Sequence, residues 1–141
     1  MAREIDMQVM RYLNLFSKVT RVSTMNCFVY NNQILFAVPK SKVSFAIGKD
    51  AVNIRKLRDI LRRKIKVVAM PEQEDRSGIS KFVEDVVKPI EFTKLDYRDG
   101  SVVVTAGRQS KAALIGRNRI REKEIGYVLK NLFGIEKFKI M

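Results

Sequence analysis

Two short segments combine a glycine with a cation in a way suited to phosphate binding. They are Gly48-Lys49-Asp50-Ala51 and Gly116-Arg117-Asn118-Arg119. Because glycine has no side chain, a nucleic-acid backbone can approach it closely. The N–H groups that follow lie at a predicted helix start, where positive partial charge favours phosphate. In each segment the second residue adds a full positive charge, and the third is expected to cap the following helix.

The chain as a whole is strongly basic. It has 141 residues, with 28 Lys and Arg against 15 Asp and Glu, and a net charge of +13. This charge predicts attraction to nucleic acid or to an anionic membrane face. No apolar run reaches the roughly 18 residues that a membrane span needs, and the N-terminus lacks the layout of a secretory signal. Nucleic acid is therefore the favoured partner, with no membrane.

The chain has few of the residues that catalysis or metal binding requires. It contains no histidine and one cysteine, Cys27. The commonest general base is therefore missing, and a zinc site with four Cys or His ligands cannot form. Cys27 lies in an apolar run, so we expect a small core residue in a protein of the reducing cytoplasm. We expect no enzyme, no cofactor and no metal.

Apolar spacing in the first half predicts a helix, two strands, two further helices and a strand. The first helix covers residues 4–20, with Ile5 and Phe16 on its apolar face. Strands over 27–30 and 34–38 are joined by Asn31-Asn32, since Asn tolerates a positive φ. A short helix over 42–47 ends at Gly48, and a long helix over 52–64 precedes a strand over 65–70.

A segment with Pro, Ser, Gly and local acid divides the chain. We therefore predict a first domain over 1–71, a short linker over 72–78 and a second domain over 79–141. The second half repeats the order of the first. Its predicted elements are a helix over 79–87, strands over 90–97 and 101–105 with a hairpin at Asp99-Gly100, helices over 109–115 and 120–133, and a strand over 135–140.

The two halves also share the spacing of their core residues. Gly48 and Gly116 are 68 positions apart, and at this offset Leu57 corresponds to Ile125 and Leu61 to Leu129. Sequence identity between the halves is low, but the shared element order and spacing indicate duplicated modules.

These loops and this element order resemble the KH domain, whose defining loop is GXXG after an isoleucine. KH loops clamp about four nucleotides of single-stranded RNA. A helix and two strands before the helix-loop-helix is similar to the type II arrangement. The closer resemblance is to the short archaeal NusA-like transcription factors, which consist of two such domains. It is carried by Phe16-Ser17-Lys18-Val19-Thr20 with Cys27, Phe36-Ala37-Val38, Ala46-Ile47-Gly48-Lys49 with Asn53, and Ile115-Gly116-Arg117-Asn118.

The resemblance implies an α+β fold of two tandem type II KH modules. Each would be helix-strand-strand-helix-helix-strand, with the helices on one face of a three-stranded sheet. It implies a non-enzymatic factor that binds single-stranded RNA and regulates transcription elongation or termination, with RNA polymerase or the elongation complex as a further partner. A ribosome-associated or rRNA-processing KH protein is the alternative, and a basic DNA-binding module is a third class. A monomer is expected.

The candidate RNA-binding residues are the two loops and the start of the first long helix. They are Ile47, Gly48, Lys49, Asp50, Ala51, Val52, Asn53, Arg55, Lys56, Gly116, Arg117, Asn118 and Arg119.

The chain departs from the KH pattern at the fourth loop position, where Ala51 and Arg119 replace glycine. Glu122 also stands at an expected core position of the second module, where the first has Ile54. The first loop is therefore expected to be the stronger RNA contact.

A stripe of cations flanks the first long helix, with Asp59 as the only opposing charge. Its members are Arg55, Lys56, Arg58, Arg62 and Arg63. Because unbalanced charge attracts at long range, we expect this stripe to face phosphate.

Overall fold

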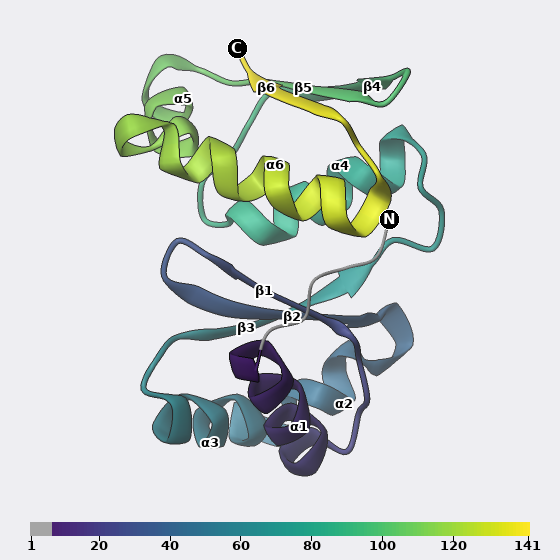
Figure 1. Ribbon diagram of the computed structural model, residues 1–141, viewed down its shortest axis with the longest axis vertical. Helices are drawn as coiled ribbons and strands as arrows, with labels where there is room; N and C mark the ends of the chain where they lie inside the picture. The colour runs from purple at the N-terminus through teal and green to yellow at the C-terminus, as the bar shows by residue number, and fades with distance from the viewer. Residues whose placement is uncertain (1–6) are drawn as a thin grey trace. The chain divides into compact units, whose positions relative to one another are not determined.

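The computed structural model describes residues 7–141, so the predicted helical residues 4–6 lie outside the described part. The chain divides into two compact units, of which the first ends at Met70 and the second begins at Pro71. Each unit contains one three-stranded sheet, and the described residues include six α-helices (Figure 1). The predicted α+β class is therefore confirmed. No helix within residues 7–141 has the length and apolar character needed to cross a membrane.

The first unit has the order helix, two strands, two helices, strand. Its elements are α1 (Met7–Thr20), β1 (Asn26–Tyr30), β2 (Gln33–Pro39), α2 (Val43–Ile47), α3 (Val52–Leu61) and β3 (Ile65–Met70). Strand β2 pairs antiparallel with β1 and parallel with β3. Since a parallel pair needs a crossover connection, α2 and α3 carry the chain back to the end where β2 begins.

The core of the first unit lies between its sheet and its helices. Phe16 of α1 stacks on Phe36 of β2 with ring centroids 4.2 Å apart. Both are fully buried, as are Ala46 of α2 and Leu57 of α3. All three helices lie on the same side of the sheet (Figure 1). The short helix α2 and the long helix α3 are thus fixed to the sheet by their apolar faces.

The second unit repeats this order. Its elements are α4 (Arg76–Val87), β4 (Lys94–Arg98), β5 (Ser101–Thr105), α5 (Arg108–Ile115), α6 (Ile120–Phe133) and β6 (Lys137–Ile140). Strand β5 pairs antiparallel with β4 and parallel with β6. Phe82 of α4 meets Phe133 of α6 edge to face, with centroids 5.1 Å apart. Leu129 of α6 is fully buried.

Three predicted boundaries are wrong, and each has a local reason. Helix α4 begins at Arg76, inside the predicted linker, because the Asp75 side chain accepts a hydrogen bond from the Gly78 N–H at 2.8 Å. Helix α3 ends at Leu61, because Arg62 takes a left-handed conformation with φ 58°. Strand β4 starts only at Lys94, since the Ile90 N–H turns back to the Val87 carbonyl.

Replacing Phe16 by alanine tests the core of the first unit. Phe16→Ala removes a fully buried ring that stacks on Phe36, so we expect a loss of about 3–5 kcal/mol in the free energy of unfolding. Urea unfolding followed by circular dichroism measures it. Met7→Ala on the same helix is the control, because Met7 is 83% exposed, and its effect should stay below about 0.5 kcal/mol. Equal effects of the two substitutions would contradict this core.

Candidate functional site

The two glycine loops have nearly the same backbone geometry. Gly48 follows α2 with φ 82° and ψ 164°, and Gly116 follows α5 with φ 74° and ψ 173°. In each unit the glycine N–H donates to the carbonyl four residues earlier at 3.0 Å. Its carbonyl accepts from the N–H three residues later at 3.1 Å. Two loops of unlike sequence thus form the same turn between a short and a long helix.

The third and fourth loop residues both adopt the left-handed conformation. Asp50 and Ala51 have φ 55° and 58°, and Asn118 and Arg119 have φ 55° and 61°. The residues that directly precede α3 and α6 are therefore Ala51 and Arg119, and neither makes a side-chain cap. The prediction that Asp50 and Asn118 cap these helices is wrong, because each lies one residue earlier, inside the turn.

The first glycine is required by space as well as by its φ. A Cβ at Gly48 would lie 2.9 Å from Asn53 Nδ2 and 2.9 Å from Val52 Cγ1. The Asn53 Nδ2 in turn donates to the Phe45 carbonyl of α2 at 3.4 Å. Asn53 therefore ties the start of α3 to α2 across the glycine, which holds the loop in its turn.

The second glycine meets a different neighbour. A Cβ at Gly116 would lie 2.6 Å from Arg121 Cγ. Arg121 corresponds in position to Asn53 of the first unit, and its guanidinium pairs with Glu124 at 2.7 Å. The side chain five residues after the glycine thus occupies the same place in both units.

The loops differ in the charge that they present. Lys49 and Asp50 are both exposed, so opposite charges stand side by side in the first loop. The second loop has exposed Arg117, Asn118 and Arg119. A phosphate at the first loop would meet one cation and one carboxylate, and at the second it would meet Arg117 and Arg119 with no carboxylate among the loop residues.

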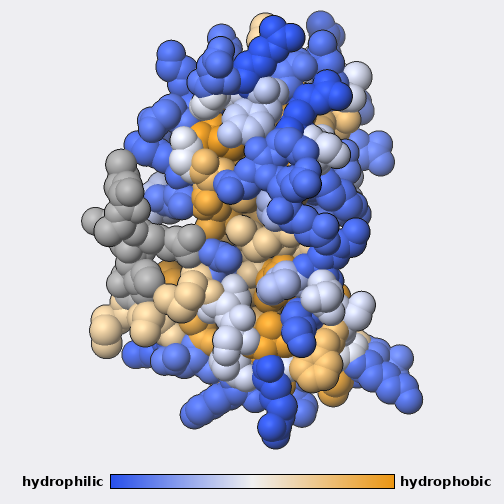
Figure 2. All heavy atoms as spheres, turned by 90° about the vertical axis from the view of Figure 1, so that its right-hand side faces the viewer, coloured by the Kyte–Doolittle hydropathy of each residue, from blue (hydrophilic) through white to orange (hydrophobic). Residues whose placement is uncertain are grey.

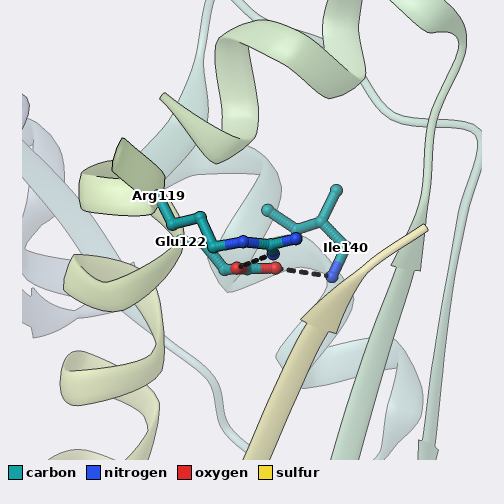
Figure 3. Close-up of polar contacts among 3 residues, drawn as sticks. All are labelled: Arg119, Glu122 and Ile140. Carbon is teal, nitrogen blue, oxygen red and sulfur yellow. Dashed lines mark hydrogen bonds and ion pairs between the residues drawn. The ribbon is translucent and has the colours of Figure 1, made fainter. Parts of the chain in front are cut away.

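Glu122 explains how the second unit accommodates a carboxylate at an expected core position. Its side chain is only 13% exposed. One carboxylate oxygen accepts from the Arg119 guanidinium at 2.8 Å, and the other accepts from the Ile140 N–H of β6 at 3.1 Å (Figure 3). Glu122 thus links the second loop to the sheet and holds Arg119 toward α6.

The predicted cationic stripe does not follow one helix. Arg55 and Lys56 are exposed on α3, and Arg58 lies in its last turn. Arg62 and Arg63 lie beyond the end of the helix, in the turn that leads to β3. The structure therefore separates the predicted stripe into a part on the helix and a part after it.

Exposed hydrophobic side chains lie beside the first loop, and one of them, Phe45, is not among the predicted site residues. Phe45 of α2 is 59% exposed and Val52 at the start of α3 is 37% exposed, whereas Ile47 is half-buried. Figure 2 looks onto the side of the first unit where α2 lies, and hydrophobic atoms reach the surface there among hydrophilic ones. The sequence indicated Phe45 by its aromatic type and its place three positions before Gly48.

Within residues 7–141, no group of three or more His, Cys, Asp and Glu side chains is placed to hold a metal ion.

Replacing Ala51 by glycine tests the strain in the first loop. Ala51 has φ 58°, a conformation that costs an L-residue roughly 1–2 kcal/mol. Glycine relieves it but loses about 0.5–1 kcal/mol of backbone entropy. We expect Ala51→Gly to stabilise by about 0.5–1 kcal/mol in urea unfolding. Ala113→Gly, inside α5, should destabilise by about 1 kcal/mol. Destabilisation by both would argue against a left-handed Ala51.

Replacing Glu122 tests its link to β6. Glu122→Ala removes the acceptor of the N–H of Ile140, a buried residue, and a buried donor without a partner costs about 1–3 kcal/mol. Glu122→Gln keeps a carbonyl oxygen at this place and should lose less. Urea unfolding compares the two variants, and equal stabilities would show that the hydrogen bond to β6 contributes nothing.

The structure is similar to a solved structure that extends over both units. It resembles the crystal structure of APE1850 with a TM-score of 0.66 and 29% sequence identity, over 97% of this chain and 100% of that one. No protein-family model matches the chain, and no curated protein matches it. The likeness supports a two-module α+β fold shared by the two proteins.

Proposed function

We propose that this chain binds single-stranded RNA through its two glycine loops and catalyses no reaction. The observation that carries the proposal is the repetition of one loop geometry in two units. Each loop has a glycine with positive φ, then an exposed cation, then two left-handed residues before a long helix. One such turn is common in proteins. The same turn twice, each with a cation at the second position, favours a shared ligand with repeated phosphates.

The surroundings of the first loop support RNA rather than an isolated phosphate ion. Exposed Phe45 and Val52 flank Gly48, and single-stranded nucleic acids are bound by aromatic and apolar side chains next to cationic grooves. The net charge of +13 adds long-range attraction for a polyanion. A base can stack on an exposed ring, whereas a free phosphate ion gains nothing from it.

We further propose that both units are type II KH domains and that the chain acts in transcription elongation or termination. Supporting this are the element order of both units and the sequence resemblance to archaeal NusA-like factors. Purification of the tagged protein from cells tests the cellular role. Enrichment of RNA polymerase subunits supports it, and enrichment of ribosomal subunits favours a ribosome-associated protein instead.

A substitution of Gly48 cannot test the contact with RNA separately from the conformation of the loop. Any Cβ there meets Asn53 and Val52 within 3 Å, and the φ of 82° disfavours other residues. A loss of binding would therefore mix strain with the loss of a contact. The exposed residues of the loop, Lys49 and Asp50, provide cleaner tests.

Two neutralising substitutions in the first loop should change RNA affinity in opposite directions. Lys49→Gln removes a phosphate contact, so the slope of log affinity against log salt should flatten by about 0.7. Asp50→Asn removes a repelling charge and should raise affinity by a factor of about 3, as expected for one charge at about 7 Å in water. Asparagine suits this backbone, since Asn118 adopts it in the second loop. Fluorescence anisotropy with single-stranded RNA measures both.

The control for net charge is Lys81→Gln. Lys81 lies on α4 and pairs with Asp85 at 3.2 Å, so its loss should leave the slope unchanged. If Lys49→Gln and Lys81→Gln weaken binding equally, binding depends on overall charge and the loop is not the contact. Tighter binding to duplex DNA than to single-stranded RNA at equal salt would favour a DNA-binding module.

A further inference from the structure

A surface pocket lies at the end of α3 that is remote from the glycine loop. Its volume is about 510 Å³. The side chains that line it, which we call the cationic pocket, are Arg58, Asp59, Arg62, Arg63 and Lys64. Because α3 has ten residues, its length separates this pocket from the loop by about 15 Å. The pocket is therefore a place distinct from the loop.

The charges in this pocket are unbalanced. Four cations face one carboxylate, that of Asp59. None of the four forms an ion pair within 4.0 Å with any residue in the described part of the chain. All but Arg63 are exposed. Arginines that no carboxylate engages can offer their paired N–H groups to a phosphate.

The backbone fixes the position of this pocket. The Arg62 N–H closes the helix by donating to the Arg58 carbonyl at 2.7 Å, and the Lys64 carbonyl accepts from the Ile34 N–H of β2 at 3.0 Å. Arg62 is also held at φ 58°, where α6 has Gly134 with φ 69°. A cation thus occupies a cap position at which glycine is free of strain.

The fold does not require these cations. The second unit has the same long helix followed by the same parallel strand. When the two helices are aligned on their last residues, Leu61 and Phe133, it carries Lys130, Asn131, Gly134, Ile135 and Glu136 at the corresponding positions, with a single cation among them. Cations near a helix C-terminus are favoured by the helix dipole, but the second unit ends its helix without four of them. The end of the helix alone therefore does not explain the four cations of the first unit.

We propose that the cationic pocket is a second phosphate-binding site, which binds the backbone of the same single-stranded RNA beyond the nucleotides held by the Gly48 loop. This inference rests on the proposed RNA binding. Its basis is charge complementarity, together with a fixed distance from the loop. A strand that leaves the loop crosses about 15 Å and then meets a phosphate site on the same unit.

The test compares two lengths of oligouridine, four and twelve nucleotides, by fluorescence anisotropy across a salt series. The loop is expected to hold about four nucleotides, and the remaining eight span about 27 Å at 3.4 Å each. The Arg58→Gln/Arg63→Gln variant should lose about 1.4 in salt slope on the twelve-nucleotide RNA, at about 0.7 per phosphate contact. It should bind the four-nucleotide RNA like the wild type.

Two controls separate binding from folding and from net charge. Lys130→Gln neutralises the one cation at the corresponding positions of the second unit and should retain the wild-type slope. Arg62→Gly should raise the melting temperature while it weakens binding to the longer RNA, because it removes both the strain and a cation. A melting temperature that rises with no loss of affinity counts against the pocket.

The outcomes distinguish this inference from the proposed function. If Lys49→Gln weakens binding of both lengths but the pocket variant binds the longer RNA like the wild type, only the pocket is overturned. If the pocket variant weakens both lengths equally, it acts through general charge and the separate site is also overturned. If the wild type binds neither RNA, the proposed function fails. Loss of slope on the longer RNA alone supports the pocket.

Discussion

Each unit depends on a reversal of the chain that ordinary L-residues disfavour. Between α2 and α3 the backbone passes through Gly48 with φ 82° and then through two left-handed residues. The second unit repeats this sequence of angles at Gly116. Without the reversal the long helix could not return along the sheet, and the last strand could not pair parallel to its neighbour. The turn that we propose as the RNA contact is thus also the turn on which each fold depends.

The packing on both sides of the turn offsets its strain. Ala46 and Leu57 are fully buried on either side of the first loop, and Leu114 and Ile125 are buried around the second. The glycine is confined by the side chain five residues later, Asn53 or Arg121. Strain held in this way fixes the backbone of the turn and leaves the cation at the second position exposed, which suits a residue that contacts a ligand.

Features with local causes could be predicted from the sequence. The hairpins at Asn31-Asn32 and Asp99-Gly100 were found because these residue types accept positive φ. The end of α3 was missed because Leu61-Arg62-Arg63-Lys64 favours helix, whereas sheet pairing places Ile65 beside Ile34. Glu122 was expected to place a carboxylate in the core without a partner. Its partner, the Ile140 N–H, lies 18 positions away in the sequence and could not be foreseen.

In the candidate site, too, only features with local causes could be predicted from the sequence. The positions of both loops followed from glycine and helical spacing, and the exposure of Lys49 and Arg117 followed from their charge. The left-handed backbone of Ala51 and Arg119 could not be read from their types, since neither favours it. The cationic pocket could not be predicted from the sequence for a similar reason. The predicted stripe of cations on one helix included Arg62 and Arg63, which lie after the end of α3.

The short connection between the units has a consequence for how tightly a long ligand is held. Only residues 71–75 lie between the end of β3 and the start of α4. If the chain binds RNA as proposed, a strand held by one unit confines the other unit near it at an effective concentration that reaches millimolar for short linkers. Two individually weak contacts could then give strong binding to a long strand and little to a short one. The chain would select RNA by the length of its unpaired region as well as by its chemistry.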